Sequence, residues 1–183
     1  MLEKYYISKK ENTDLNVYRC GIEECLPNHS WGPGVRDHYI IHLIISGKGC
    51  FTVNGKTHNL EAGEGFLICP GEIVSYKADS ILPWKYSWVG FHGLKAQQII
   101  NRAGLSIDVP TFRYDERDFL VESLDEMITE ARSRRPSDLM LSGLLYQFLA
   151  RLVKSLQFRE PVAGKNLDSS SYVSKAIEYI EKT

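Results

Sequence analysis

The chain has 183 residues, of which 43% are hydrophobic and 25% are charged, and its formal net charge is −1. This composition is ordinary for a globular domain with one substantial core, and the near-neutral charge gives no electrostatic footprint for nucleic acid. No run approaches the ~18 apolar residues of a membrane span, and the first residues lack the apolar core of a signal peptide. We therefore expect a cytoplasmic chain with no membrane partner and little affinity of its own for DNA.

The cysteines Cys20, Cys25, Cys50 and Cys69 are even in number, but nothing directs export, so we expect reduced, packed thiols. Cys20, Cys25 and His29 do not have the spacing of a common zinc site, and no fourth ligand is evident. The chain also has no Gly-x-Ser-x-Gly elbow and no phosphate-binding loop. We therefore expect no metal, no cofactor and no catalytic residue.

The first half of the chain is predicted to form short strands. The segment 39–45 is dense in β-branched and aromatic residues and ends at a Ser-Gly-Lys-Gly turn. Asn54-Gly55 is a strong hairpin signal, because both central residues of a type I′ turn need positive φ. A polar arm is expected at 5–14 and a loop at 27–34. Strands are expected at 17–22, 39–45, 50–53, 56–60, 66–69, 70–76 and 84–91. Short strands in succession, with no helical period between them, predict an antiparallel barrel or jelly roll.

After residue 93 the hydrophobic period becomes helical. A short helix at 94–103 is expected to stop at Gly104, since glycine favours the position after a helix end. Asp115 is expected to cap a second helix that ends near Arg135, and Ser137 or Asp138 a third that runs to about residue 157.

The third helix is apolar over more of its circumference than one neighbour covers. A 4-3-4 spacing of apolar residues is typical of two helices that cross at a shallow angle. We therefore expect a homodimer interface on this helix. The row with this spacing consists of Leu141, Leu145, Phe148 and Leu152.

After residue 158 the apolar pattern of the third helix ends. The segment 159–170 has linker composition, and 172–182 has the apolar spacing of a helix. A single helix of this length cannot bury its own apolar face. It is expected to open a further domain, and the alternative is that it folds back onto the core.

The turns follow one another in a distinctive order: Ser-Gly-x-Gly, Val-Asn-Gly, Leu-x-Ala-Gly-x-Gly and Phe-Leu-Ile-x-Pro. A Glu-x-x-x-Tyr pattern that ends at Tyr76 comes next, and then Trp-x-Tyr-x-Trp-Val-Gly-Phe over 84–91. This ordered set resembles the ligand-binding domain of AraC-type transcription regulators, closest to the branch that senses sugars. The resemblance covers most of the chain.

The resemblance implies a mainly β fold with helices: a cupin-like jelly-roll barrel over 1–92 and a helical dimerisation segment over 93–158. Residues 159–183 would be a linker and the first helix of an incomplete helix-turn-helix domain. It further implies a homodimer that regulates transcription as an activator or a repressor, that senses a mono- or oligosaccharide and that contacts DNA only through the missing domain. The alternatives are a metal-dependent cupin enzyme and a dimeric interaction module without a ligand.

Candidate ligand-binding residues follow from the alternation of side chains along strands. Arg36, His38 and His42 share one face of the central strand, and the same parity groups three aromatic residues further on. Aromatic rings stack on the C–H faces of sugars, while polar side chains bond the hydroxyl groups. The resemblance implies a role for three of the aromatic residues, Tyr76, Tyr86 and Trp88. The full candidate set is Arg36, His38, His42, Tyr76, Trp84, Tyr86 and Trp88.

The enzyme alternative rests on the histidines of the central strand. Four residues of strand separate the backbones of His38 and His42 by roughly 13 Å. Two nitrogens on one metal, each bonded at about 2.1 Å, must lie within about 4 Å of each other. We therefore expect that these two histidines do not share a metal and that the chain is not an enzyme.

Overall fold

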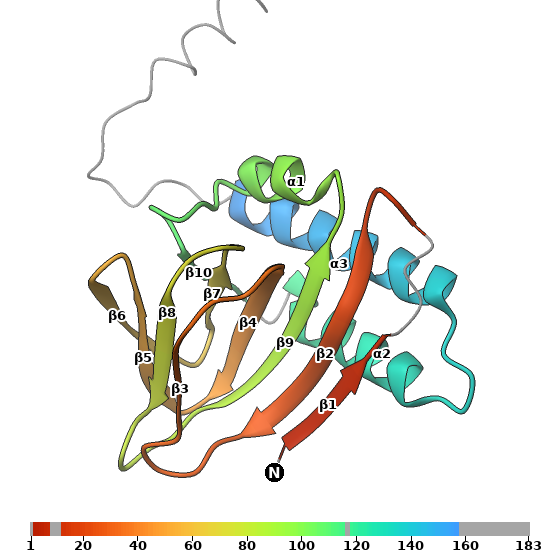
Figure 1. The fold of residues 1–183 in the computed structure, drawn as a ribbon. Helices are drawn as coiled ribbons and strands as arrows, with labels where there is room; N and C mark the ends of the chain where they lie inside the picture. Colours follow the sequence, from red (N-terminus) through yellow and green to blue (C-terminus); the bar gives the residue numbers. More distant parts are fainter. Residues whose placement is uncertain (1, 8–11, 116–117, 158–183) are drawn as a thin grey trace, which may run out of the picture.

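The structure is a computed structural model that describes residues 2–7, 12–115 and 118–157. Two antiparallel sheets face each other, and three helices are associated with the outer side of the larger sheet (Figure 1). The predicted jelly-roll barrel followed by helices is therefore confirmed. In sheet order, the larger sheet contains β1 (Leu2–Tyr6), β2 (Asn16–Glu24), β9 (Lys85–His92), β4 (Tyr39–Ser46), β7 (Glu64–Ile68) and β10 (Thr111–Arg113). The smaller sheet contains β3 (Ser30–Gly34), β8 (Val74–Ala78), β5 (Lys48–Val53) and β6 (Lys56–Glu61).

The hairpin between β5 and β6 forms where the sequence predicts it. Asn54 and Gly55 have φ angles of 51° and 70°, so both central residues of the turn lie in the left-handed region. The two strands pair antiparallel, with Val53 opposite Lys56.

The central strand β4 divides the apolar residues into two cores. Ile41 and Leu43 belong to the core between the larger sheet and the helices. Ile40 and Ile44 belong to the core between the two sheets. Even-numbered side chains of β4 therefore point into the barrel, as the alternation of residues predicts.

The helices are α1 (Ala96–Arg102), α2 (Leu120–Arg132) and α3 (Asp138–Gln157). Gly104 follows α1 with a φ of 72°, and the Ser137 hydroxyl accepts a hydrogen bond from the Met140 amide at 3.2 Å, so both of these signals are confirmed. The prediction that Asp115 caps α2 is wrong. This helix starts at Leu120, after Phe119, whose φ of 53° breaks the helical path.

Two strands lie where the sequence does not predict them. β1 forms within and before the expected polar arm, and β3 forms in the expected loop. The segment 110–114 is expected to be extended, and it contains β10, which pairs with β7 of the barrel. A boundary near residue 92 therefore does not cleanly separate barrel from helices.

The predicted dimer row on α3 faces the chain's own core. Leu141, Leu145, Phe148 and Leu152 are at most 1% exposed. They pack with β2 and α2 beneath the helices. The prediction that these four side chains form a dimer interface is therefore wrong, because the larger sheet already covers them. By length and composition alone α3 could cross a membrane, but almost half of it is buried within this chain.

The linker predicted at 159–170 and the helix predicted at 172–182 lie outside the described residues.

Candidate functional site

A cavity of about 210 Å³ lies between the two sheets, open at one end of the barrel. Five of the seven candidate residues line it: Arg36, His42, Tyr76, Tyr86 and Trp88. They come from β4, β8, β9 and the segment before β4, so residues far apart in sequence converge on one space. The remaining lining residues are Leu2, Lys4, Arg19, Glu23, His29, Trp31 and Ile40.

The aromatic walls are held in place by close packing. Trp88 lies against Gly21 of β2, where an added Cβ would lie 2.8 Å from the indole ring. Trp31 and Tyr76 stack with their ring centroids 5.4 Å apart. Gly21 therefore leaves the space that the indole of Trp88 occupies.

The other two candidate residues lie elsewhere. Trp84 is fully buried among the rings of Phe66 and Tyr86, and it lies over Gly49, so its place is in the core. His38 borders a separate shallow hollow, where its Nδ1 lies 2.6 Å from the Asp37 carboxylate. Neither side chain contributes to the wall of the cavity.

Arg36 lies between β3 and β4, and its side chain lines the cavity. Its guanidinium lies 3.9 Å from the ring centroid of Trp31, within cation–π range. Its Nε is buried and has no hydrogen-bond partner in the described part of the chain. Burial, and after it the nearby charge of Arg19, lowers the pKa of Arg36. The side chain is therefore placed to donate hydrogen bonds to a bound molecule.

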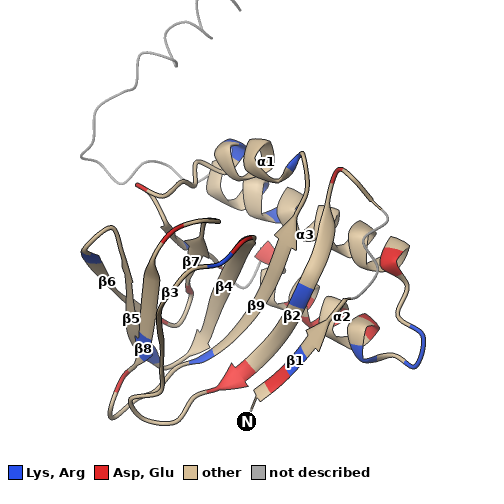
Figure 2. Cartoon of the chain, in the orientation of Figure 1, with Lys and Arg blue, Asp and Glu red and all other residues tan. Residues whose placement is uncertain are grey.

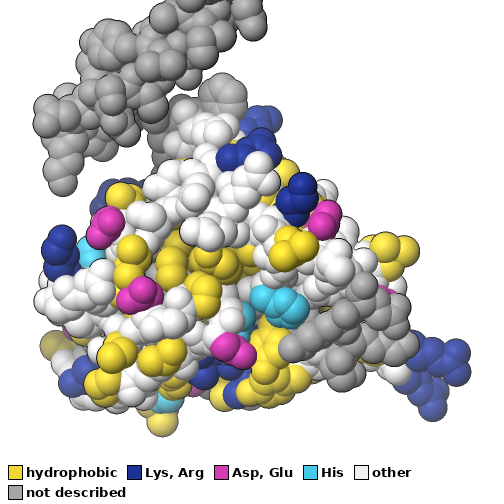
Figure 3. Space-filling view, turned by 45° about the horizontal axis from the view of Figure 1, so that its top comes forward, with side chains coloured by type: hydrophobic (Ala, Val, Ile, Leu, Met, Phe, Trp, Pro, Cys, Tyr) yellow, Lys and Arg dark blue, Asp and Glu magenta, His cyan; other side chains and the backbone are white. Residues whose placement is uncertain are grey.

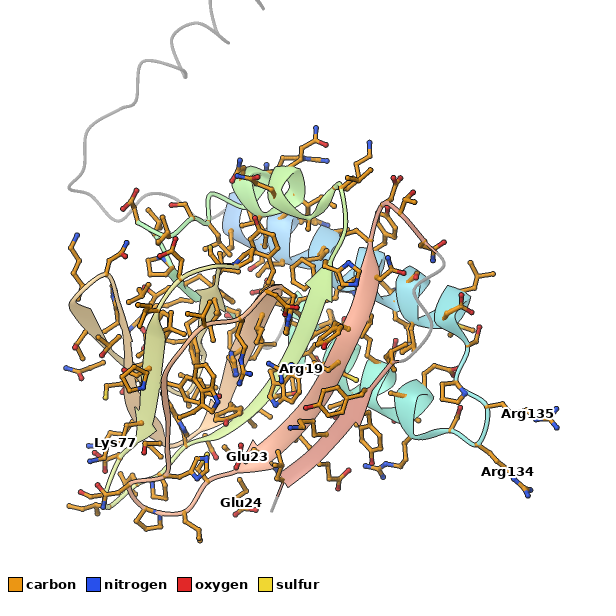
Figure 4. The ribbon with its side chains drawn as sticks, in the orientation of Figure 1. Arg19, Glu23, Glu24, Lys77, Arg134 and Arg135 are labelled. Atoms are coloured by element: carbon orange, nitrogen blue, oxygen red, sulfur yellow. The ribbon has the colours of Figure 1, made fainter. Side chains whose placement is uncertain are left out.

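Arg19 is a second inward cation, which sequence reasoning missed. It stands midway along β2 and, with Glu23 of the same strand, points toward the space between the sheets (Figure 4). Figure 2 shows this isolated basic position on an otherwise uncharged stretch of β2. Arg19 is only 6% exposed, and its guanidinium lies 5.2 Å from the Trp88 ring centroid. The alternation of Arg19, Gly21 and Glu23 with Cys20 and Ile22 is the signal that could have revealed it.

The end of the cavity that contains the carboxylate of Glu23, its acidic end, is also held by side-chain contacts. Tyr86 donates a hydrogen bond of 2.6 Å from its hydroxyl to Oε2 of Glu23. The other carboxylate oxygen of Glu23 lies 3.4 Å from Nε2 of His29. The sequence interpretation left Glu23 and His29 out of the site, because His29 falls in an expected loop and Glu23 near the end of a strand.

His42 lies at the floor of the cavity. Its ring stacks on Phe66 with centroids 4.3 Å apart, and its Nδ1 is buried without a partner in the described part of the chain. Burial lowers the pKa of His42 well below its usual range, and the charges of Arg19 and Arg36 act in the same direction. At neutral pH the imidazole is therefore uncharged, and its Nδ1 is available for a polar contact with a bound molecule.

This depressed pKa predicts a loss of stability in acid. The unfolded chain binds a proton on His42 near pH 6.5 and the folded chain does not, so stability falls as pH drops through that value. Each excluded proton contributes up to about 1.4 kcal/mol per pH unit. Burial lowers the pKa of His38 as well, so both residues contribute to the slope.

Urea denaturation between pH 7 and pH 5 measures this slope. We expect His42→Gln to flatten it, and a His38→Gln, His42→Gln double variant to flatten it further. Asn59→Gln, at an exposed position of β6 without an ionisable side chain, is the control and keeps the wild-type slope. An unchanged slope in the double variant would contradict the assignment.

A larger groove of about 820 Å³ lies outside the barrel, between the β6–β7 turn and α3. Charged side chains dominate its border, including Glu61, Arg113, Asp118 and Lys154. None of the candidate residues lines it. The cavity between the sheets, with its aromatic walls, is therefore the better candidate for a specific small-molecule site.

Two facing sheets that enclose a hollow lined by aromatic and cationic side chains define a cupin-like ligand-binding barrel. More particularly, the chain belongs to the AraC-like ligand binding domain family, whose model matches residues 16–149. This finding confirms the resemblance seen in the order of the turns.

Curated relatives agree with this assignment. The chain is 33% identical over 172 residues to the Msm operon regulatory protein of Streptococcus mutans, covering 92% of this chain and 61% of that protein. It is 29% identical over 155 residues to the lactose operon transcription activator of Staphylococcus xylosus, covering 84% of this chain and 54% of that protein. The raffinose operon transcriptional regulatory protein of Pediococcus pentosaceus is 27% identical, with coverage of 98% and 65%. The chain thus spans less than two thirds of the length of these relatives.

Solved structures resemble the barrel more loosely. YhaK from Escherichia coli is 15% identical with a TM-score of 0.45, over 51% of this chain and 45% of that one. A cupin 2 conserved barrel domain protein from Salinispora arenicola is 14% identical with a TM-score of 0.42, over 55% and 82%.

Proposed function

We propose that this chain is the effector-sensing part of a cytoplasmic transcription regulator and that it binds a sugar in the cavity between the sheets. The observation that carries the proposal is the convergence of Trp31, Trp88 and Tyr76 with Arg19 and Arg36 on one enclosed space. Flat apolar rings beside donors suit a molecule with C–H faces and hydroxyl groups. The relatives named for the lactose and raffinose operons support the same chemistry.

The size of the cavity limits what enters it. Its volume of about 210 Å³ is below the roughly 300–1,000 Å³ of pockets for drug-sized ligands. The enclosed part therefore suits one sugar ring, and the further rings of an oligosaccharide would extend through the open end.

A thermal-shift screen of mono- and oligosaccharides tests the proposal. A ligand that binds only the folded chain raises its apparent stability by an amount that grows with the logarithm of the ratio of free ligand to Kd. We expect at least one sugar to raise the melting temperature and amino acids or nucleotides to leave it unchanged. A panel in which no sugar acts would overturn the proposal.

Trp88→Ala is expected to weaken sugar binding by more than roughly 1 kcal/mol, about fivefold or more in affinity. The reason is that the indole forms a flat wall of the cavity, which alanine removes. Calorimetry with the sugar found in the screen measures the change. Phe119→Ala, which removes an exposed ring far from the cavity, is the control and should bind as the wild type does. Unchanged affinity in a folded Trp88→Ala chain would remove Trp88 from the site.

The sugar would act by shifting the regulator between two states. A ligand can move such an equilibrium only by its differential affinity for the states. DNA would be contacted through a further domain, since a formal net charge of −1 gives this chain little attraction to phosphates. The face shown in Figure 3 intersperses basic and acidic side chains around a hydrophobic centre.

We also propose that the regulator is a homodimer that pairs through the outer face of α3. Leu139, Met140 and Tyr146 are exposed on this face, at 75%, 54% and 43%. Gly143 stands between them with open space around its Cα, so a second helix could approach closely there. The spacing 139, 143 and 146 repeats the seam pattern of two paired helices on the face that the core leaves free.

A further inference from the structure

Three side chains of different chemistry meet at the acidic end of the cavity. Glu23 lies on β2, Cys25 follows the end of that strand, and His29 lies in the turn before β3. One ligating atom from each, the carboxylate oxygen, the thiol sulfur and an imidazole nitrogen, lies within 4.8 Å of the other two. We propose that these three residues bind a zinc ion.

The distances suit the coordination geometry of zinc. Bonds of about 2.0–2.3 Å in a tetrahedral site place neighbouring ligand atoms roughly 3.3–3.8 Å apart. The Glu23 oxygen and His29 Nε2 already stand 3.4 Å apart. Cys25 therefore needs only a small adjustment of its side chain to complete a three-residue set.

The ligand types select the metal. A thiolate, an imidazole and a carboxylate together match the borderline-soft preference of zinc, whereas magnesium and calcium take oxygen ligands. On binding, the thiol proton of Cys25 passes to solvent, and the two negative ligands then balance the charge of the ion. The occupied site, zinc together with its ligands, therefore carries no net charge.

Backbone and outer hydrogen bonds hold the three residues in position. The Cys25 amide donates to the Trp84 carbonyl at 3.1 Å, and the His29 carbonyl accepts from the Ala78 amide at 2.8 Å. The Tyr86 hydroxyl bonds one oxygen of Glu23 and leaves the other directed at His29. Such an outer partner orients a metal-bound carboxylate.

The sequence analysis considered Cys25 and His29 only together with Cys20 and expected no metal site. Cys20 lies on the opposite face of β2, where its sulfur is 3.8 Å from the Met127 carbonyl. The structure replaces it with Glu23. Since Glu23 and His29 also line the cavity, the coordination position left open by the protein faces the cavity, where water or a ligand oxygen would fill it.

Metal titration of the whole chain tests the site independently of any sugar. The chain is stripped with a chelator under reducing conditions and titrated with zinc by calorimetry, and cobalt is then substituted for zinc. We expect one zinc ion per chain and a near-ultraviolet absorption band of a cobalt–thiolate bond. Absence of stoichiometric zinc binding, or a cobalt complex without that band, would overturn the proposal.

Variants locate the ion. Cys25→Ser and His29→Gln should each weaken zinc binding by about 100-fold or more, since loss of an outer partner alone costs roughly 10–100-fold. Tyr86→Phe removes only the outer hydrogen-bond partner of Glu23, so it should weaken zinc binding by roughly 10–100-fold. Cys50→Ser and His58→Gln remove a half-buried thiol and imidazole of the smaller sheet and should bind as the wild type does. If Cys25→Ser fails to fold, His29→Gln decides, because this side chain is 39% exposed and its loss leaves the core intact. Wild-type affinity in His29→Gln would contradict the site.

Discussion

Leu145→Asp is expected to leave the chain unfolded or aggregated at 25 °C. Leu145 is fully buried between α3 and the larger sheet. Removing a buried leucine side chain alone costs about 2–5 kcal/mol, and an unpaired carboxylate in an apolar core adds a further penalty. The total approaches the roughly 5–15 kcal/mol that stabilises an ordinary domain. Circular dichroism and urea denaturation measure the loss.

The neighbouring residue provides the matched control. Tyr146 is 43% exposed on the opposite face of α3, so Tyr146→Asp should fold normally. If the helix pairs with a second copy through this face, sedimentation should show a dimer in the wild type and a monomer in Tyr146→Asp. Leu145→Met, which conserves volume, should cost less than about 1.5 kcal/mol. A stable, folded Leu145→Asp chain would show that α3 does not pack on the sheet.

The same helix shows where sequence reasoning stops. The spacing of Leu141, Leu145 and Phe148 correctly identifies a buried seam, but a periodic pattern does not state whether the partner is another chain or the chain's own sheet. The sequence interpretation gave the helix one neighbour within the chain and assigned its remaining apolar surface to a partner chain. In the structure α3 packs on β2 as well as on α2, so the chain itself covers this row.

The strand pattern was more informative, since side-chain alternation is a local property of the backbone. Parity along β4 predicted that His42 points into the barrel. It gave the same expectation for Arg36 and His38, which precede β4, and of these two only Arg36 lines the cavity. Parity could not distinguish the roles of Trp84 and Trp88, because both side chains point inward. Whether an inward ring lies in the core or lines the cavity depends on how deep the cavity reaches. Arg19 was missed because a bulge between Val17 and Arg19 shifts the register of β2 against β9.

Arg19→Met is expected to stabilise the ligand-free chain and to abolish its response to sugar. The guanidinium is almost fully buried, and its Nε lacks an acceptor within the described residues. No carboxylate of that part of the chain forms an ion pair with it. A buried cation without a counter-charge is costly. Even buried ion pairs, whose charges offset each other, have often gained up to roughly 1–4 kcal/mol on apolar replacement.

The size of the gain depends on Trp88. The cation–π contact between Arg19 and Trp88 offsets about 0.5–2 kcal/mol of the desolvation cost, so we expect a net gain of about 1 kcal/mol. Methionine fills a similar volume and keeps contact with the indole ring, but it cannot donate a hydrogen bond to a hydroxyl group. Stability without ligand and affinity for ligand should therefore change in opposite directions.

Urea denaturation with and without the sugar separates the two effects. Wild type should gain stability when the sugar is added, and Arg19→Met should start higher and gain nothing. Lys77→Met is the matched control, because Lys77 is an exposed cation on β8, and its loss should change neither quantity (Figure 4). An Arg19→Met chain that is less stable than wild type, yet still stabilised by sugar, would make Arg19 a structural residue of the barrel. An Arg19→Met chain that is more stable than wild type and gains nothing from sugar would mean that the barrel retains a buried charge, at the expense of stability, because the ligand requires it.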